Sequence, residues 1–373
     1  MKLSKQKLPL FVAFVLACFG CSQEHDVKTR SFYLGFTPFP YDISEEAVNY
    51  VYDKIETEAD IINHHFDNGV PWQEALTGAP FSQAVIDDWN FRKTHTSASL
   101  KVYLSVTPIN FSRDGLAAYR GAQDNMALPA PWNTYQFNDE PVKTAYLNYC
   151  KRSIDFFKPA YFNMAIEANL LFFNNPSLWT NYLEFHTYIY QQLKAIYPDL
   201  PIFTSVAGAH LLDGYFGGND HSLQRLAALQ LMDYSDFYAV SFYPYLSGFL
   251  GNPYPENTFD ELFSISPKPL VIAETGYVAE SFTIDVGAGP VSIESDPAKQ
   301  QNYFKDLLQA CEKRKAKFVI NFALRDYDQL WEDIGSPNDI GIAWRDSGFY
   351  DENGNARPAL STWKEYFSQK YQP

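Results

Sequence analysis

The chain is poor in cysteine, and after its N-terminal segment it lacks any apolar run long enough to span a bilayer. Four cysteines occur in 373 residues, and two of them, Cys18 and Cys21, lie in that N-terminal segment. The other two, Cys150 and Cys311, belong to separate helical patterns. We therefore expect two free, buried thiols in the folded domain, with no disulfide and no metal cluster.

Basic residues are also scarce. Lys and Arg number 29 against 44 Asp and Glu, so the formal net charge is −15 at pH 7. Long-range repulsion would slow the encounter with nucleic acid or with a strongly anionic polymer. The charge balance argues against nucleic acid as a partner and favours a neutral substrate.

Several familiar catalytic and cofactor motifs are missing. The glycine-rich phosphate turn of dinucleotide-binding sheets does not follow the first expected strand, where the sequence is Phe36-Thr37-Pro38-Phe39-Pro40. No serine-centred nucleophile elbow and no Cys/His pairing is evident. The sequence has no internal repeat or low-complexity linker, so we expect one domain.

The N-terminal segment is typical of an export signal. Lys2, Lys5 and Lys7 precede an apolar stretch, Leu8 to Ala17, which is too short to span a bilayer comfortably. The residues that follow resemble a bacterial lipoprotein cleavage box, with Cys21, or alternatively Cys18, as the lipidated residue. We assign residues 1–21 to a lipoprotein-type signal peptide and expect an exported lipoprotein of the bacterial cell envelope, at the outer membrane or the periplasmic face. The alternative is an ordinary secreted protein.

From residue 28 to residue 373, strand patterns alternate with helix patterns. Such alternation requires parallel strands joined by right-handed crossovers, and eight units are the number that closes a barrel. We predict an α/β fold, a single (β/α)8 TIM barrel, with an open doubly wound sheet as the competing arrangement. The expected strands are 31–36, 59–66, 100–107, 159–167, 201–207, 236–243, 269–274 and 317–323, and the expected helices are 45–58, 83–94, 142–158, 178–197, 222–232, 258–263, 297–315 and 359–370.

The loops differ in length between the two ends of the expected barrel. The connections that follow strands are long, whereas most of those that precede strands have only a few residues. The long loops therefore lie on the C-terminal face, where barrel enzymes have their active sites. The long ones are 108–140, 245–257, 275–296 and 325–358.

Two of the expected strands end in a glutamate. Glu167 closes the fourth strand and Glu274 the seventh, 274 − 167 = 107 positions later. If side chains alternate along each strand, Leu270 and Ile272 share the direction of Glu274, and Asn163 and Ala165 share that of Glu167. Two carboxylates that reach across a barrel mouth to about 5 Å have the spacing of a retaining glycosidase.

This pattern resembles clan A of the glycoside hydrolases over essentially the whole chain from Lys28 onward. The resemblance implies that Glu167 is the acid/base and Glu274 the nucleophile. It also implies that Tyr243, at the end of the sixth strand, donates a hydrogen bond to the nucleophile.

Two positions depart from the clan pattern. Ile166 precedes the acid/base where the clan usually has an asparagine, and Asn169 or Asn163 is the candidate replacement. The eighth strand ends in Phe322 rather than the tryptophan that often serves as a sugar platform. Trp331 or Trp344 in the following loop is the candidate replacement there.

Other polar and aromatic residues remain candidates for substrate binding. Of the adjacent pair His64 and His65, one should line the cleft floor, and we assign His64; neighbours on a strand face opposite sides, which argues against a metal site. Trp72 and Trp132, like Trp331 and Trp344, lie in post-strand loops as either sugar platforms or loop anchors.

The sequence therefore predicts a monomeric retaining glycoside hydrolase with one catalytic domain, which cleaves a neutral polysaccharide or oligosaccharide without a metal or organic cofactor. Its N-terminal lipid would hold it at the membrane. The long loops favour an open groove and internal cleavage. A surface glycan-binding barrel without catalysis is the main alternative, and a barrel enzyme of another class, such as a lyase or a metal hydrolase, is the second.

Overall fold

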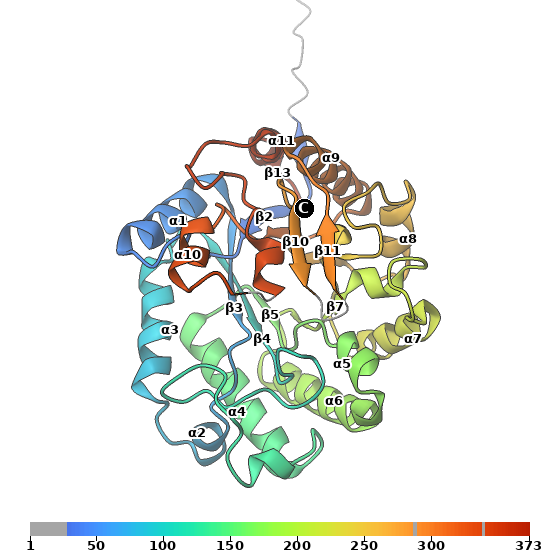
Figure 1. Ribbon diagram of the computed structural model, residues 1–373. Helices are drawn as coiled ribbons and strands as arrows, with labels where there is room; N and C mark the ends of the chain where they lie inside the picture. Colours follow the sequence, from blue (N-terminus) through green and yellow to red (C-terminus); the bar gives the residue numbers. More distant parts are fainter. Residues whose placement is uncertain (1–27, 286–288, 338–339) are drawn as a thin grey trace, which may run out of the picture.

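The computed structural model describes residues 28–285, 289–337 and 340–373, which contain a closed barrel of parallel strands (Figure 1). The sheet order is β6-β5-β4-β3-β2-β12-β9-β8-β7. The strands are β2 (Tyr33–Phe36), β3 (Ile61–Phe66), β4 (Lys101–Val106), β5 (Tyr161–Asn163), β6 (Ile202–Phe203), β7 (Ser205–Ala207), β8 (Tyr238–Phe242), β9 (Leu270–Thr275) and β12 (Phe318–Asn321).

The barrel closes through its fifth strand, which is interrupted at one residue. β6 pairs with β5 and β7 pairs with β8, and only Thr204 separates β6 from β7. The two edges of the sheet are therefore consecutive in the chain. The eight expected strand positions and the (β/α)8 fold are confirmed.

Helices surround the barrel, and all eight expected ones are present. Their first turns are capped by side chains. The Ser44 hydroxyl accepts a hydrogen bond from the backbone amide of Ala47 at the start of α1, and the Asp296 carboxylate accepts hydrogen bonds from two backbone amides at the start of α9. The helices are α1 (Glu45–Glu58), α3 (Gln83–His95), α4 (Glu140–Phe157), α6 (Trp179–Ile196), α7 (His221–Met232), α8 (Thr258–Ser264), α9 (Pro297–Arg314) and α11 (Pro358–Phe367), with the shorter α2 (Trp72–Thr77), α5 (Asn169–Asn174) and α10 (Asp328–Asp333) in loops.

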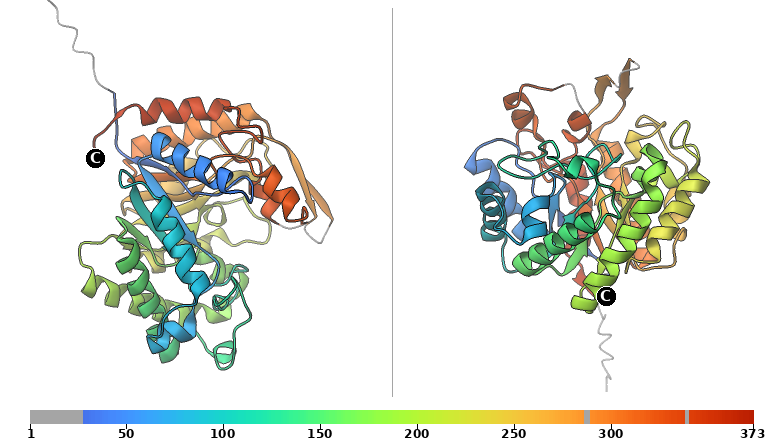
Figure 2. Two further views of the ribbon diagram at one scale, coloured as in Figure 1. Left: turned by 90° about the vertical axis from the view of Figure 1, so that its left-hand side faces the viewer. Right: turned by 90° about the horizontal axis from the view of Figure 1, so that it is seen from below.

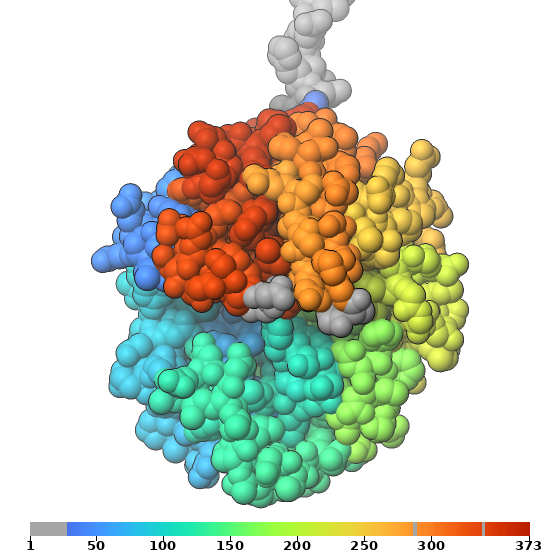
Figure 3. Space-filling model, viewed as in Figure 1, coloured from blue at the N-terminus to red at the C-terminus, as the bar shows by residue number. Residues whose placement is uncertain are grey.

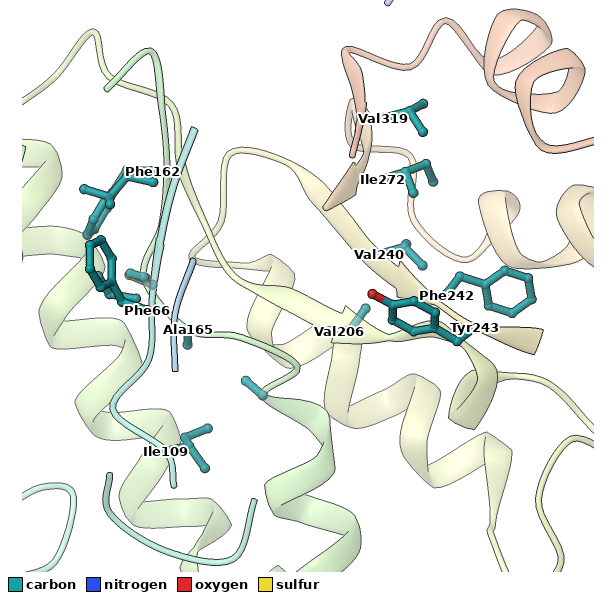
Figure 4. Close-up of a cluster of buried hydrophobic side chains, with 14 of the residues drawn as sticks. Phe66, Ile109, Phe162, Ala165, Val206, Val240, Phe242, Tyr243, Ile272 and Val319 are labelled. Atoms are coloured by element: carbon teal, nitrogen blue, oxygen red, sulfur yellow. The ribbon is translucent and has the colours of Figure 1, made fainter. Parts of the chain in front are cut away.

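The core has two layers, one inside the barrel and one between the sheet and the helices. Figure 4 shows part of the outer layer, where Val240, Ile272 and Val319 stand in a row across β8, β9 and β12. Cys150 and Cys311 are both free and buried in helices of this layer, as expected. The inner layer contains Ile61, Tyr103, Phe203, Ala239, Val271, Ala273, Phe318 and Ile320.

The two ends of the barrel carry different structures. At the end where the strands begin, β1 (Thr29–Arg30) pairs in parallel with β13 (Lys370–Tyr371). At the opposite end, the hairpin of β10 (Phe282–Asp285) and β11 (Pro290–Ile293) projects from the molecule (Figure 2). The described part of the chain contains no helix with the length and apolar character needed to cross a membrane. The proposed lipidation sites, Cys18 and Cys21, lie outside the described residues.

Candidate active site

Glu274 lies at the C-terminal end of β9 and is held by two side chains from other strands. The Tyr243 hydroxyl, just after β8, donates a hydrogen bond to its Oε1 at 2.5 Å. The His65 Nδ1, on β3, lies 3.2 Å from its Oε2. Burial, and then the charge of Glu274, raises the pKa of Tyr243 well above its ordinary value, so the phenol stays protonated as a donor. Both oxygens of Glu274 therefore have a fixed partner.

Glu274 faces the cleft for a reason that simple alternation did not capture. We expected Leu270 and Ile272 to share its direction, but Val271 and Ala273 are the β9 residues inside the barrel. The pairing of β9 with β8 shifts by one residue just before Glu274, which leaves Ala273 without a partner on β8. This irregularity turns Glu274 toward the barrel axis, because one additional residue reverses the alternation.

Glu167 does not end a strand as expected. β5 stops at Asn163, whose side-chain oxygen accepts hydrogen bonds from the amides of Ala165 and Ser205, each at 3.2 Å. Backbone hydrogen bonds to the neighbouring chain continue beyond this point, from Met164 to Phe203 and from Ser205 to Ala165. Glu167 then adopts a left-handed backbone with φ of 49°. Its own amide donates to the Ser205 hydroxyl at 3.0 Å. The acid is therefore presented from a turn braced by β7, and the strand predicted over 159–167 is wrong in its second half.

An arginine and an aspartate accompany Glu167. The guanidinium of Arg113 binds both carboxylate oxygens of Asp67, at 3.1 and 2.7 Å, and lies 3.7 Å from Oε2 of Glu167. Burial raises the pKa of Glu167 to about 7; Arg113 opposes this shift, and the negative charge of Glu274 adds to it. Glu167 therefore holds a proton under mildly acidic conditions.

Glu167 and Glu274 line one cleft with a volume of about 680 Å³. Figure 3 shows the face on which it opens, hollowed between the red and orange C-terminal segments and the cyan and green loops. The wall combines aromatic rings with a few polar groups, as ligand sites usually do. The lining residues are Thr37, Pro38, Phe39, His65, Asp67, Asn68, Arg92, Phe111, Arg113, Asn125, Ile166, Glu167, Leu170, Glu274, Phe322, Tyr327, Ile340, Gly341 and Trp344.

Of the four candidate tryptophans, only Trp344 lines this cleft, where its ring meets that of Tyr243 edge to face at 5.7 Å. Trp72 and Trp132 stack on each other at 5.5 Å, and the Trp72 indole donates to the Ala117 carbonyl. Both are buried loop anchors, and Trp132 borders a separate cavity. Trp331 is a buried residue of α10 and does not line the cleft.

His64 and Asn169 also lie elsewhere than we expected. His64 is fully buried on the helix side of β3, against Thr96 and Phe157, and burial lowers its pKa to about 3. The alternation rule was correct, but the wrong member of the histidine pair was assigned to the cleft. Asn169 is buried and joins α5 to the backbone of Ala207, accepting its amide at 2.7 Å. Neither Asn169 nor the other candidate, Asn163, lines the cleft, so neither replaces the asparagine that the clan usually has at the position of Ile166.

Sequence reasoning missed the residues that come from loops. Asp67 immediately follows β3, so a polar residue just past a strand end was an available signal. Arg113 gave none, because it lies in a long loop and meets Asp67 only in the folded chain. Phe39, from the segment after β2, packs edge to face on Phe322 at 5.2 Å, so a pair of phenylalanine rings occupies the end of the eighth strand.

A group of carboxylates on the same face is close enough to share a cation. Asp326, Asp328 and Asp346 have oxygen atoms within 4.8 Å of one another. Arg357 forms an ion pair with Asp326, and Arg345 forms ion pairs with Asp328 and Asp346. These arginines compensate most of the negative charge, so the group serves as an ion-pair network that braces the loops after β12.

Comparison with known proteins finds the fold of this chain among solved structures. No family model and no curated protein matches the chain. A GH5_18 variant from Bifidobacterium longum subsp. longum ATCC 55813, in complex with Manb1-4GlcNAc, aligns with a TM-score of 0.62 at 13% identity, over 92% of this chain and 80% of that one.

Two further structures align over similar lengths of this chain. The exo-beta-1,4-mannosidase Op5Man5 from Opitutaceae bacterium strain TAV5 has a TM-score of 0.60 at 11% identity, over 91% of this chain and 59% of its own. Native xylanase 10B from Thermotoga maritima has a TM-score of 0.56 at 11% identity, over 90% and 95%. This chain therefore has the (β/α)8 barrel fold that these glycosidases share.

Proposed function

We propose that the protein is a retaining glycoside hydrolase in which Glu274 is the nucleophile and Glu167 the acid/base. One observation carries the proposal. Two carboxyl groups line the same cleft in different surroundings: Glu274 accepts a hydrogen bond from a phenol, whereas burial raises the pKa of Glu167 to about 7. A pair of carboxyl groups that differ in this way can divide the roles of nucleophile and acid.

The reaction proceeds in two displacements. A carboxylate oxygen of Glu274 attacks the anomeric carbon while Glu167 transfers its proton to the glycosidic oxygen, and the leaving alcohol departs. Glu167, now ionised, takes a proton from water, whose oxygen attacks the same carbon and releases Glu274. Tyr243 and His65 hold the nucleophile in place through both steps. Because both displacements use only the two carboxyl groups and water, the proposed mechanism involves no metal or organic cofactor.

The proposed substrate is a neutral oligosaccharide or polysaccharide. The net charge of −15 disfavours acidic polymers, and the aromatic lining from Phe39, Phe322 and Trp344 suits the apolar faces of sugar rings. Two of the similar structures are an exo-beta-1,4-mannosidase and a protein bound to Manb1-4GlcNAc. A β-linked mannoside is therefore the first substrate to test, with β-glucosides and β-xylosides beside it.

Azide rescue of an alanine variant tests the role of Glu274. Aryl β-glycosides of these sugars should be cleaved with release of the β-anomer first. Glu274→Ala should lose turnover, and azide should restore part of it with the α-glycosyl azide as product, because the small anion enters where the carboxylate was. Glu167→Ala should keep activity on aryl glycosides with good leaving groups, and azide should then give the β-azide.

The alternative function is a glycan-binding barrel without catalysis. Ile166 and Phe322 favour it, because both stand where clan A glycoside hydrolases, which the chain resembles, often have sugar-contacting residues. Binding of an oligosaccharide by the unaltered chain, with no reducing ends released over a day, would establish this alternative. Full activity of Glu274→Ala would reject the proposed nucleophile under either view.

We also propose that the protein is exported and anchored through lipid on Cys21. Palmitate labelling of cells that express the chain tests this, and Cys21→Ser should abolish the label while Cys18→Ser retains it. Labelling that persists in Cys21→Ser and disappears in Cys18→Ser would move the site to Cys18.

A further inference from the structure

A second cavity lies outside the barrel, between α8 and α9, which are neighbours at its edge (Figure 1). Its volume is about 440 Å³, within the range of small-molecule sites. It shares no lining residue with the catalytic cleft. Tyr277 borders it only three residues after Glu274, so the groove adjoins the loop that follows the nucleophile.

The floor of the groove is a continuous row of aromatic rings. Tyr254 meets Phe259 at 6.2 Å, Phe259 meets Tyr303 at 6.1 Å, and Tyr303 meets Tyr277 at 5.1 Å. Phe259, Tyr303 and Tyr277 are buried, whereas Tyr254 is only partly covered. A tyrosine in this position offers an apolar ring face and a polar tip to a ligand.

The α9 side of the groove carries polar groups that the protein itself does not use. Within the described residues, no hydrogen bond reaches the side chains of Asn302, Asp306 and Gln309, or the hydroxyl of Tyr254. Asn302, Asp306 and Gln309 lie three or four positions apart, so they share one face of the helix. Amide, carboxylate and phenol groups beside an aromatic floor are the groups that bind sugar hydroxyls and the apolar face of a sugar ring.

The charges around the groove select against an anionic ligand. Lys313 pairs with Asp260 at 2.6 Å, so these two charges offset each other, whereas Lys299 donates to the neutral carbonyls of Gly251 and Glu294 and keeps its positive charge. With Glu256 and Asp306, the wall has three carboxylates against two ammonium groups, so its net charge is negative. A neutral ligand meets no such repulsion.

We propose that this groove is a second, non-catalytic saccharide site that holds a neutral oligosaccharide beside the catalytic face. The choice of a saccharide as ligand rests on the proposed function, but binding in the groove does not require catalysis. The site would hold a polymer near the cleft and so raise its local concentration. It would leave small substrates unaffected, because they occupy the cleft alone.

Calorimetric titration of the full chain carrying Glu274→Ala tests the groove without turnover. The ligands are mannotetraose, cellotetraose and xylotetraose, each titrated separately. The substitutions Asn302→Ala and Asp306→Ala, made together in this Glu274→Ala chain, should remove one bound equivalent of a tetrasaccharide or lower its affinity about tenfold. A tenfold loss corresponds to roughly one good hydrogen bond. Lys305→Ala, an exposed change on the same helix outside the groove, is the matched control and should retain that equivalent.

Activity measurements separate this proposal from the catalytic one. In the chain with Glu274 intact, Asn302→Ala/Asp306→Ala should leave aryl glycoside turnover unchanged and slow the hydrolysis of the matching polymer. If all three saccharides bind equally well with and without the groove substitutions, the second site is refuted, whatever the catalytic tests show. If no glycoside is cleaved but the groove substitutions still remove one bound equivalent of tetrasaccharide, the catalytic proposal fails and the proposal of a saccharide site in the groove is supported.

Discussion

The hydroxyl of Tyr243 lies 2.5 Å from Oε1 of Glu274, and this contact joins the ends of the sixth and seventh barrel strands. The contact makes one carboxylate of the cleft an acceptor with a fixed orientation. The other carboxyl, Glu167, is partly buried beside Arg113 and Asp67. This difference between the two acids determines how each should respond to substitution and to pH.

Tyr243→Phe should lower kcat about 10- to 100-fold, because a hydrogen bond to a charged group contributes roughly 1.5–3 kcal/mol. Initial rates on an aryl glycoside measure the loss. Tyr238→Phe is the matched control, since that buried hydroxyl donates to the Leu262 carbonyl on the helix side. Equal losses in the two variants would show that Tyr243 acts through stability alone.

Activity should fall as the pH rises through about 7, because Glu167 must carry a proton in the first step and its pKa is raised to about 7. Replacing Arg113 with methionine removes the positive charge that opposes this shift. The alkaline limb of kcat/KM should then move to higher pH. A limb that stays in place would mean that another group controls it.

Glu167→Gln should stabilise the protein at pH 8 and have little effect at pH 4. A carboxyl whose pKa is raised on folding keeps its proton longer in the native state, so the free energy of unfolding falls as the pH rises from about 4.5 to about 7. The neutral amide avoids this loss. Thermal unfolding should show a gain in Tm of about 2 °C or more at pH 8, and an equal gain at both pH values would contradict this explanation.

Trp344→Ala should raise KM about tenfold, because its ring lines the cleft beside Tyr243. Trp132→Ala should instead lower the free energy of unfolding by about 3–5 kcal/mol, since that ring is buried against Trp72. Steady-state kinetics and urea unfolding on both variants separate the two roles. A KM change in Trp132→Ala without loss of stability would overturn this assignment.

The alternation of strands and helices was sufficient to predict the barrel and to place Glu274 at a strand end. The details at the mouth depend on tertiary contacts that no local pattern contains. The Asn163 side chain accepts the amide hydrogen of Ala165 where β5 ends, and the shift at Ala273 reverses the alternation that would have pointed Glu274 outward. For Glu274, period-two reasoning predicted the direction toward the cleft, but for the wrong geometric reason.

The same limit applies to the other candidate residues. Alternation predicted that His64 and His65 face opposite ways, yet which of them faces inward depends on the register of β3 with its neighbours. A post-strand tryptophan contacts a ligand or anchors a loop according to how that loop folds. Arg113 could not be predicted from the sequence, because its partners Asp67 and Glu167 lie in two other parts of the chain.

The pairing of β1 with β13 places Lys28 at the rear of the barrel, away from the hairpin of β10 and β11 (Figure 2). A tether at this end would attach the molecule to a surface through the end of the barrel opposite the cleft. The mouth would then point away from the supporting surface, and long chains arriving from the surroundings would reach it without having to pass beneath the protein.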